Sequence, residues 1–399
     1  MQLDHFDFDR FLRDYWQKRP LLIRNPWQGW SNPLEPDELA GLACEEGVES
    51  RLITLANDRA HDPWPDAWNI EHGPFPEPRF SDLGKQPWTL LVQAADHHVP
   101  AIAALIEPFR FVPNWRIDDV MVSYATDGGG VGPHFDQYDV FLIQGLGRRR
   151  WQVGAVCDAA TRLLPHDDLR LLADFSVTEE WLLEPGDILY VPPRFAHNGI
   201  AVGDDCMTYS IGFRAPSRSE LIAHWCDDLL ERLDDDDRYQ DPGLPAQRNP
   251  GEISAQALAG LHALITEKMG DRDAFARWFG RYNSTRKYPD IDWRPEEPID
   301  VAELQEWLGH DLQLCRNPAS RFSFISQPAN AVLLFVDGQS FACAAETAEF
   351  ARQLCALPRF TLRPDLLQAD AARQLLATLY NQGSVAFEPD DDTPHEDED

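Results

Sequence analysis

The sequence predicts an α+β chain with an all-β core, a helical middle block and a smaller, winged-helix-like C-terminal domain. Between residues 115 and 193, short segments rich in β-branched and aromatic residues alternate with Gly/Pro turns. This alternation is typical of a barrel or a double-sheet jelly roll. Apolar residues at helical spacing follow from 217 to 289, and short strands alternate with helices from 290 to 388. The 399 residues are enough for two or three domains, each with its own core.

The N-terminal part supplies the elements that precede the core. Apolar residues between Phe6 and Trp16 predict a short amphipathic helix, which leads into a strand at 21–24. Helices are expected at 36–46 and 88–97, separated by loops rich in Pro and Trp. The core strands are then predicted at 115–124, 138–143, 148–153 and within the segment 184–193, and the core should end near residue 216.

Two histidines and one aspartate in the core form a candidate metal site. His134 and Asp136 follow a Gly-rich stretch, and His197 comes later in the chain. Because side chains two apart on a strand point to one side, His134 and Asp136 can bind one face of a metal, and a later strand can bring His197 to complete that face. This is the facial triad of non-haem Fe(II) oxygenases, which leaves positions open for a bidentate cosubstrate and dioxygen.

The motifs around these residues resemble those of the Jumonji-C (JmjC) 2-oxoglutarate oxygenases, in particular the bacterial ribosomal-oxygenase group. The resemblance weakens after about residue 218 and is carried by Tyr15-Trp16-Gln17-Lys18-Arg19-Pro20, Trp115-Arg116-Ile117-Asp118-Asp119, Gly145-Leu146-Gly147-Arg148-Arg149-Arg150-Trp151 and Tyr209-Ser210-Ile211-Gly212-Phe213-Arg214-Ala215-Pro216. It implies a double-stranded β-helix of the cupin or jelly-roll type, an Fe(II) ion, and 2-oxoglutarate and O2 as cosubstrates. It also implies hydroxylation of an arginine in the large-subunit (50S) ribosomal protein numbered sixteen.

The resemblance further assigns Arg149 and Ser123 to 2-oxoglutarate. In the family, a basic residue on the strand after the metal-binding pair holds the distal carboxylate, and Arg149 matches that position; Ser123 matches a hydroxyl near the cosubstrate. Strand parity agrees for Arg149, which shares a face with the apolar Trp151. Arg148 and Arg150 fall on the opposite face and are expected in solvent. A guanidinium can bind a carboxylate through two parallel hydrogen bonds.

Three residues are candidates for the substrate pocket: Asp119, Met121 and Tyr138. By parity, Asp119 and Met121 share a face of one strand, and Tyr138 lies two residues beyond Asp136. An acid, a thioether and a phenol around the iron would suit an arginine side chain, because the acid pairs with the guanidinium while the other two cover the methylenes. An alternative of similar weight is that Asp119 caps or pairs with Arg116 at the surface.

Two other functions also fit these residues. One is a JmjC hydroxylase of another protein residue, a histidine or a lysine, for which Asp119 would be an unusual pocket residue. The other is a non-oxygenase metal-binding cupin, in which Arg149 and Ser123 would have no cosubstrate to hold.

The net charge of −32 bears on the partners. It argues against direct nucleic-acid binding, because phosphate contacts need clustered Lys and Arg. It favours a basic partner such as a ribosomal protein, although solvated acidic surface of the kind found in salt-adapted proteins explains it equally well. We expect neither a membrane span nor a secretory leader, and a cytoplasmic location. Seven cysteines without a Cys-x-x-Cys pair indicate reduced thiols.

Three further segments should follow an oxygenase domain at 1–216. Ser217-Arg218-Ser219-Glu220 has the form of a capping box and begins a helical domain at 217–289, which the resemblance implies forms a homodimer. A winged-helix-like domain is expected at 290–388, with a hairpin turn at Asp337-Gly338. It lacks a basic recognition helix, so we expect a protein-contact or structural role. Residues 389–399 form an acidic tail that we expect to be disordered.

Overall fold

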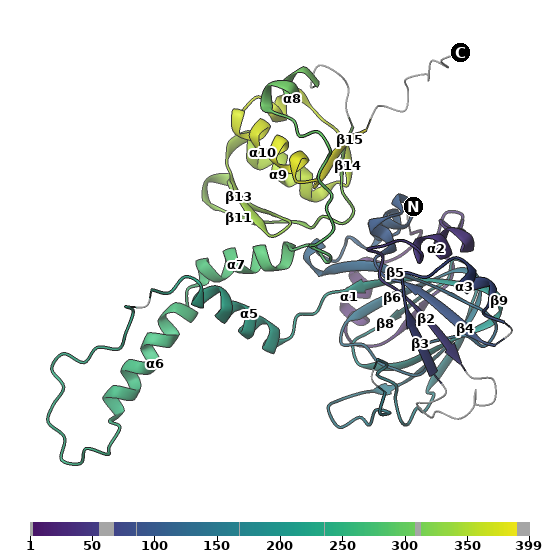
Figure 1. Ribbon diagram of the computed structural model, residues 1–399, viewed down its shortest axis with the longest axis horizontal. Coiled ribbons are helices and arrows are strands. Elements are labelled where there is room, and N and C mark those ends of the chain that lie inside the picture. The colour runs from purple at the N-terminus through teal and green to yellow at the C-terminus, as the bar shows by residue number, and fades with distance from the viewer. Residues whose placement is uncertain are drawn as a thin grey trace. The chain divides into compact units, whose positions relative to one another are not determined.

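The computed structural model describes residues 3–55, 68–84, 86–166, 168–234, 236–307 and 313–388. The chain divides into two compact units, Met1–Ala215 and Pro216–Asp399, and Figure 1 labels their elements where there is room. Both units combine helices and strands, so the predicted α+β class is confirmed. Among the described helices, none is long and apolar enough to cross a membrane.

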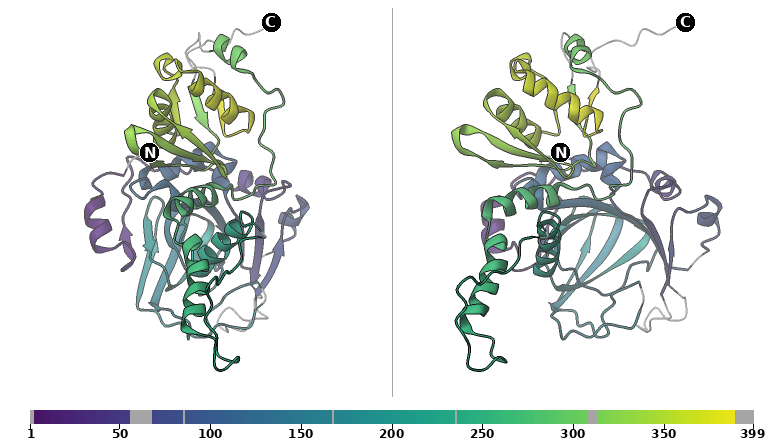
Figure 2. Two further views of the ribbon diagram at one scale, coloured as in Figure 1. Left: turned by 90° about the vertical axis from the view of Figure 1, so that its left-hand side faces the viewer. Right: turned by 60° about the vertical axis from the view of Figure 1, so that its left-hand side comes forward.

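The first unit is built on a nine-stranded antiparallel sheet. Its strand order is β1 (Leu21–Ile23), β8 (Ile188–Val191), β6 (Asp139–Val156), β9 (Phe195–Phe213), β5 (Ile117–Ala125), β4 (Trp88–Val92), β2 (Ser50–Leu55) and β3 (Trp68–His72), with β7 (Glu179–Leu183) also paired to β6. The strands curve around a common interior, as the two views in Figure 2 show. This is the barrel or jelly-roll core that the strand pattern predicted.

β6 and β9 are the longest strands, and they pair with each other along both of their halves. Between the halves the register shifts at Gly145 and Gly147. Gly147 has a φ of +57°, and a Cβ there would lie 2.6 Å from the carbonyl oxygen of Asp205. The strands expected at 138–143 and 148–153 are therefore one strand with two irregularities between them, where glycine permits a bend that a larger residue would resist; a third register shift follows Val153.

The prediction of a helix at 88–97 is wrong. Residues Trp88–Val92 form β4, which pairs with β2 and β5, and a short 3-10 helix covers Ala95–His97. Four of the five β4 residues are buried. A short, fully buried apolar run has no polar alternation, so its periodicity does not distinguish a core strand from a buried helix.

Short helices connect the strands, and the core of this unit is aromatic. The α-helices are α1 (Phe8–Asp14), α2 (Pro36–Leu42), α3 (Pro78–Ser81) and α4 (Pro100–Ala103), and further 3-10 helices cover Ala104–Phe109 and Asn114–Arg116. The ring centroids of Phe11 and Tyr190 lie 4.9 Å apart, and those of Phe109 and Phe141 lie 4.6 Å apart. Such ring pairs add to the stabilisation that burial of apolar surface provides.

Three helices begin the second unit: α5 (Arg218–Leu230), α6 (Ala255–Met269) and α7 (Arg272–Ser284). The predicted capping box is confirmed. The Ser217 hydroxyl accepts the amide N–H of Glu220 at 3.1 Å, and the Glu220 carboxylate accepts that of Ser217 at 2.6 Å. Trp225 of α5 packs against Trp278 of α7, with ring centroids 5.3 Å apart. By contrast, α6 contains no buried residue.

The rest of the second unit contains two three-stranded sheets, ordered β14–β10–β15 and β11–β12–β13. Its elements are α8 (Val301–Trp307), β10 (Gln313–Arg316), β11 (Phe322–Ser326), a 3-10 helix (Pro328–Asn330), β12 (Val332–Val336), β13 (Gln339–Cys343), α9 (Ala345–Ala356), β14 (Arg359–Thr361), a 3-10 helix (Pro364–Leu367), α10 (Asp370–Asn381) and β15 (Val385–Glu388). The predicted hairpin turn is confirmed, with φ of +49° at Asp337 and +82° at Gly338. The short strands β10 and β14 were not predicted. The expected acidic tail at 389–399 lies outside the described residues.

α7 packs directly on the β11–β13 sheet. A Cβ added at Gly280 would overlap the ring of Phe335 on β12. At the end of the helix, the Ser284 hydroxyl accepts the amide N–H of Gly338 at 3.1 Å. The helix therefore depends on glycine for its close approach to the sheet.

Candidate metal and cosubstrate site

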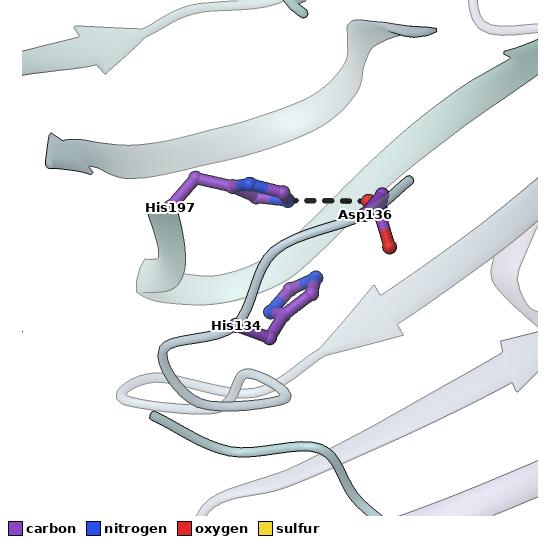
Figure 3. Close-up of side chains that lie close together, drawn as sticks. All are labelled: His134, Asp136 and His197. Carbon is purple, nitrogen blue, oxygen red and sulfur yellow. Dashed lines mark ion pairs between the residues drawn. The ribbon is translucent and has the colours of Figure 1, made fainter. Parts of the chain in front are cut away.

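His134, Asp136 and His197 lie together in the first unit. Their ligand atoms all lie within 4.8 Å of one another, and Nε2 of His197 is 3.5 Å from Oδ2 of Asp136. Figure 3 shows the two imidazoles and the carboxylate converging from two segments of the chain, with His197 on β9. Two imidazoles and one carboxylate that meet in this way are the donor set of a facial-triad iron site.

Backbone carbonyls fix the tautomer of both histidines. Nδ1 of His134 lies 2.8 Å from the carbonyl oxygen of Gly132, and Nδ1 of His197 lies 2.9 Å from that of Phe195. A carbonyl oxygen only accepts, so each Nδ1 carries the proton and each Nε2 presents a lone pair. A hydrogen bond to the second ring nitrogen is also what holds a metal-binding imidazole in one orientation.

His197 is kept neutral by its surroundings. Its side chain is buried, and the His134 ring centroid lies 4.3 Å away. Burial first, and then the neighbouring His134 ring, lower the pKa of His197 to about 4, while the Asp136 carboxylate opposes this shift. A neutral imidazole is the form that binds a metal, so the ring is ready to do so at neutral pH.

The segment that carries His134 and Asp136 is not a regular strand, so the prediction that a strand pleat aligns their side chains is wrong. His134 forms one antiparallel bridge with His197, in which the two backbone N–H···O bonds measure 3.0 and 2.8 Å. The backbone carbonyl of Asp136 accepts the N–H of Arg194 at 2.6 Å. Gly132 has a φ of +81°, which a residue with a Cβ rarely adopts. These backbone contacts bring the side chains together without a pleated strand.

Arg149 occupies the face of β6 that parity predicted. It is 3% exposed, whereas Arg148 and Arg150 are exposed. Four residues later on β6, Val153 is the ladder partner of His197. Because side chains alternate along a strand, Arg149 and His197 project from the same face of the strand pair.

The residues between Arg149 and His197 fit a bound carboxylate. Nη2 of Arg149 lies 3.5 Å from the hydroxyl oxygen of Ser123, and both side chains are buried. The Nε–H of Arg149 and the indole N–H of Trp151 are buried and have no hydrogen-bond partner among the described residues. An unpaired buried donor costs about 1–3 kcal/mol, so these two indicate an acceptor supplied by a bound group. The Trp151 ring lies 5.9 Å from that of His197, which places the donors beside the metal-binding cluster.

The candidates for substrate contact differ in exposure. Asp119 is 3% exposed, Tyr138 is 43% exposed, and Met121 is intermediate. A Cβ added at Gly212 of β9 would lie 3.9 Å from both Oδ1 of Asp119 and Cε2 of Tyr138, so these two side chains flank one point of the sheet. Partial burial, together with the negative charges of Asp136 and Asp119, raises the pKa of Tyr138 and keeps the phenol protonated.

Asp119 is buried, so the alternative that it pairs with Arg116 at the surface is wrong about the exposure of Asp119. The Arg116 guanidinium donates to Asp139 at 3.1 Å. Parity is also interrupted at this point, since the register between β5 and β9 shifts between Ile117 and Val120.

Sequence reasoning missed two polar groups of the site. Trp151 was recognised as an apolar neighbour of Arg149, but its indole N–H was not considered as a donor. Gln93 was assigned to the wrongly expected helix, whereas its side-chain amide donates to Oδ2 of Asp119 at 2.7 Å. The Trp151 donor could have been found from the strand parity that placed Arg149. The Gln93 donor leaves no signal in the local sequence, because its role depends on a contact between distant segments.

Comparison with known proteins identifies the family. Residues 104–221 match the JmjC domain, and residues 265–386 match the ROXA-like winged helix. The chain is 42% identical over 304 residues to the ribosomal protein uL16 3-hydroxylase of Escherichia coli (strain K12), covering 75% of this chain and 78% of that protein. The chain belongs to the family of JmjC ribosomal oxygenases.

Further relatives of this ribosomal oxygenase agree with that assignment. It is 35% identical over 345 residues to the probable ribosomal oxygenase of Haemophilus influenzae, covering 84% of this chain and 80% of that protein. The X-ray structure of E. coli YcfD matches with a TM-score of 0.86 at 35% identity, over 97% of this chain and 100% of that one. Another structure, of YcfD in complex with cobalt and 2-oxoglutarate, matches with a TM-score of 0.83.

Membership of this family confirms the predicted JmjC core and winged-helix domain. It also confirms the predicted enzyme class, a 2-oxoglutarate-dependent oxygenase that uses iron, and the His134, Asp136 and His197 cluster supplies a donor set that fits the metal. The alternative of a non-oxygenase metal-binding cupin is therefore excluded.

Proposed function

We propose that this oxygenase hydroxylates an arginine side chain of ribosomal protein uL16, the large-subunit protein numbered sixteen. The buried carboxylate of Asp119 carries the substrate assignment, because a buried acid selects a cationic side chain. It lies beside Tyr138, which follows Asp136 by two residues. The E. coli relative is a uL16 3-hydroxylase, and position 3 of the arginine is part of the proposal for this chain.

His134, Asp136 and His197 would hold Fe(II), and a set of three protein ligands leaves coordination positions for the cosubstrate and dioxygen. When bound, the iron would let dioxygen act as the oxidant: one oxygen atom would go to 2-oxoglutarate, which becomes succinate and carbon dioxide, and the other would become the hydroxyl oxygen of the substrate. The protein supplies orientation and a dry interior. Apolar side chains close the interior on this face of β6 and its neighbours: Val140, Leu142, Trp151, Val153, Leu183, Leu189 and Val191.

Arg149 and Ser123 hold 2-oxoglutarate in this proposal. The guanidinium offers a planar fork that matches the distal carboxylate, while the Ser123 hydroxyl adds a hydrogen bond beside it. The unpartnered Nε–H of Arg149 and indole N–H of Trp151 support this role, because a carboxylate between them would satisfy both.

Asp119, Met121 and Tyr138 bind the substrate in this proposal. The Asp119 carboxylate pairs with the guanidinium, and the thioether and phenol ring cover the methylenes. The target carbon must be held close to the metal with little freedom, since misplacement by about 1 Å can cost about 100-fold in rate. A loosely held side chain would let 2-oxoglutarate turn over without hydroxylation.

A histidine or lysine substrate is the second candidate. Over 81 residues the chain is 36% identical to a bifunctional lysine-specific demethylase and histidyl-hydroxylase of Brugia malayi, but this covers only 19% of the chain. A neutral imidazole has no need of a buried carboxylate, and an ammonium is a compact charge that cannot bind a carboxylate with a planar fork. Asp119 therefore favours arginine.

Mass spectrometry of ribosomal proteins tests the proposed function. The proteins are incubated with this enzyme, Fe(II), 2-oxoglutarate and air, beside an Asp136→Ala control. A gain of one oxygen on an arginine of uL16, absent in the control, is the expected result. Oxidation of a histidine or lysine would favour the second candidate. Succinate formation without any protein oxidation would support the oxygenase activity and rule out uL16 as the substrate.

We also propose the quaternary and domain organisation. The helical domain at 217–289 forms a homodimer. Helix α6 supports this, because it buries no residue and its Leu258 and Ile265 side chains are 55% and 61% exposed.

The oxygenase domain spans 1–216 in this proposal. The winged-helix-like domain spans 290–388 and has a protein-contact or structural role. A ribosomal substrate would place the enzyme in the cytoplasm, and the charge of −32 suits a basic partner better than nucleic acid.

A further inference from the structure

We propose that Gln93 is a positioning residue for the substrate arginine, because its side-chain amide sets the orientation of the Asp119 carboxylate that receives the guanidinium. The inference rests on the proposed role of Asp119. Gln93 directly follows β4, and its Nε2 donates to Oδ2 of Asp119 on β5 at 2.7 Å. A hydrogen bond of this length to a carboxylate is among the stronger kinds found in proteins.

The backbone at Asp119 needs support because β5 is irregular there. The register between β5 and β9 shifts between Ile117 and Val120. The N–H of Val120 donates to Oδ1 of Asp96 at 2.8 Å. A bulge redirects the side chains that it carries and is common beside active sites. The turn after β4 therefore holds two adjacent positions of the irregular segment: Gln93 holds the Asp119 side chain, and Asp96 holds the Val120 amide.

Gln93 is itself held on both sides. Its backbone N–H donates to the carbonyl oxygen of Glu49 at 2.9 Å, and its Oε1 lies 3.5 Å from Nη2 of Arg51 on β2. The next residue, Ala94, has a φ of +50°, so the chain turns sharply at this point. With a guanidinium on the oxygen side and a carboxylate on the nitrogen side, the amide has one favourable orientation. The donor is thus preorganised toward Asp119.

An uncharged amide suits this position better than a cation would. It fixes one carboxylate oxygen without neutralising the charge that the substrate needs. A lysine at position 93 would instead form an ion pair with Asp119, and the substrate guanidinium would have to compete with it. Gln93 thus contributes to the selection of arginine through Asp119, without touching the substrate.

Steady-state kinetics of the full-length enzyme with uL16 test the inference. Gln93→Leu removes the donor, and Gln93→Lys introduces the competing cation. Gln28→Leu is the matched control, because Gln28 donates to Asp4 at the same distance of 2.7 Å on the surface. We expect Gln93→Leu to raise KM for uL16 about tenfold, in line with the strength of hydrogen bonds to charged groups, and Gln93→Lys to raise it further.

Two further readouts separate positioning from a structural role. KM for 2-oxoglutarate should stay unchanged, while the fraction of 2-oxoglutarate consumed without hydroxylation should rise in both Gln93 variants. In an Asp119→Asn background, Gln93→Leu should add little, because both changes remove one interaction. A KM for 2-oxoglutarate that rises in step with that for uL16, with a lower melting temperature, would indicate a structural role and overturn the inference.

The inference and the proposed function fail in different ways. If Asp119→Asn weakens uL16 hydroxylation but both Gln93 variants match Gln28→Leu, the inference is overturned and the proposed function stands. If the wild-type enzyme leaves uL16 arginines unmodified, the proposed function falls and the inference with it.

Discussion

Arg149 of β6 and His197 of β9 project from the same face of one antiparallel strand pair. His197 pairs with Val153, so Arg149 lies four residues, or about 13 Å, along the strands from the histidine. An arginine side chain and a cosubstrate with a carboxylate at each end can together bridge this distance. In the proposed site, the strand pair therefore sets the spacing between the metal-binding end and the end that binds the distal carboxylate.

Replacement of Arg149 should weaken binding of 2-oxoglutarate. Because the guanidinium is buried, Arg149→Leu removes the charge that would bind the distal carboxylate in the proposed site, and we expect KM for 2-oxoglutarate to rise at least about tenfold. Arg149→Lys should recover part of the loss, since an ammonium keeps the charge but loses the fork. Succinate formation at varied 2-oxoglutarate concentration measures both effects.

Arg148→Leu is the matched control for that experiment. Arg148 is the adjacent residue of the same strand, carries the same charge and is exposed on the other face. Its replacement should leave KM for 2-oxoglutarate unchanged. Equal effects at both positions would show that general positive charge, and not the buried guanidinium, attracts the cosubstrate.

Gly199 should be needed for the position of Trp151. The two residues pair across β9 and β6, and a Cβ at Gly199 would lie 2.7 Å from the indole ring. Gly199→Ala should therefore displace the ring, lower the free energy of unfolding by about 1–3 kcal/mol and weaken 2-oxoglutarate binding. Denaturant unfolding and cosubstrate titration measure the two losses.

Gly41→Ala provides the comparison for Gly199. Gly41 lies in helix α2, and a Cβ there would meet nothing within 4 Å. Alanine in a helix is favoured over glycine by up to about 1 kcal/mol, so this variant should be neutral or more stable. If Gly199→Ala behaved in the same way, the contact with Trp151 would not constrain the site.

The grouping of His134, Asp136 and His197 and the burial of Arg149 could be predicted from the sequence, because the signals for both are local. Few residue types bind iron, and a His-x-Asp pair after glycines stands out in the chain. The burial of Arg149 between two exposed arginines follows from the period of a strand.

The partners of Asp119 could not be predicted, because they depend on long-range packing. Gln93 is 26 positions away along the chain, on an element that was expected to be a helix. The irregular register of β5 at Asp119 also breaks the alternation on which a parity argument depends. Such a bulge is set by the neighbouring strand and turn, and leaves no pattern in the local sequence.

The stability of the metal-free protein should depend on pH through His197. Its pKa is about 4 in the folded protein, below the value of 6.5 for an unperturbed histidine. As the pH falls, the unfolded state therefore takes up a proton first. The stability that depends on neutral His197 is complete above about pH 6.5 and is lost progressively as the pH falls to about 4.

Thermal unfolding with a chelator present measures this effect. The melting temperature of the wild type should fall more steeply between pH 6.5 and 4 than that of His197→Gln, which has no group to protonate. Parallel curves for the two proteins would mean that His197 does not have to stay neutral for the protein to fold.

The exposed face of α6 should hold the homodimer together. The helix has no buried residue, yet Leu258, Leu261 and Ile265 recur at helical spacing and are 55%, 40% and 61% exposed. Placing a charge in the centre of an apolar interface leaves it buried without a partner, so Leu261→Asp should shift the dimer toward monomer. Glu267→Ala, on the same helix but at an exposed charged position, is the control.

Light scattering coupled to size exclusion should give a dimer for the wild type and the control and a monomer for Leu261→Asp. A wild type that is monomeric at micromolar concentration would contradict the proposed dimer, whereas a Leu261→Asp protein that stays dimeric would place the interface on another surface.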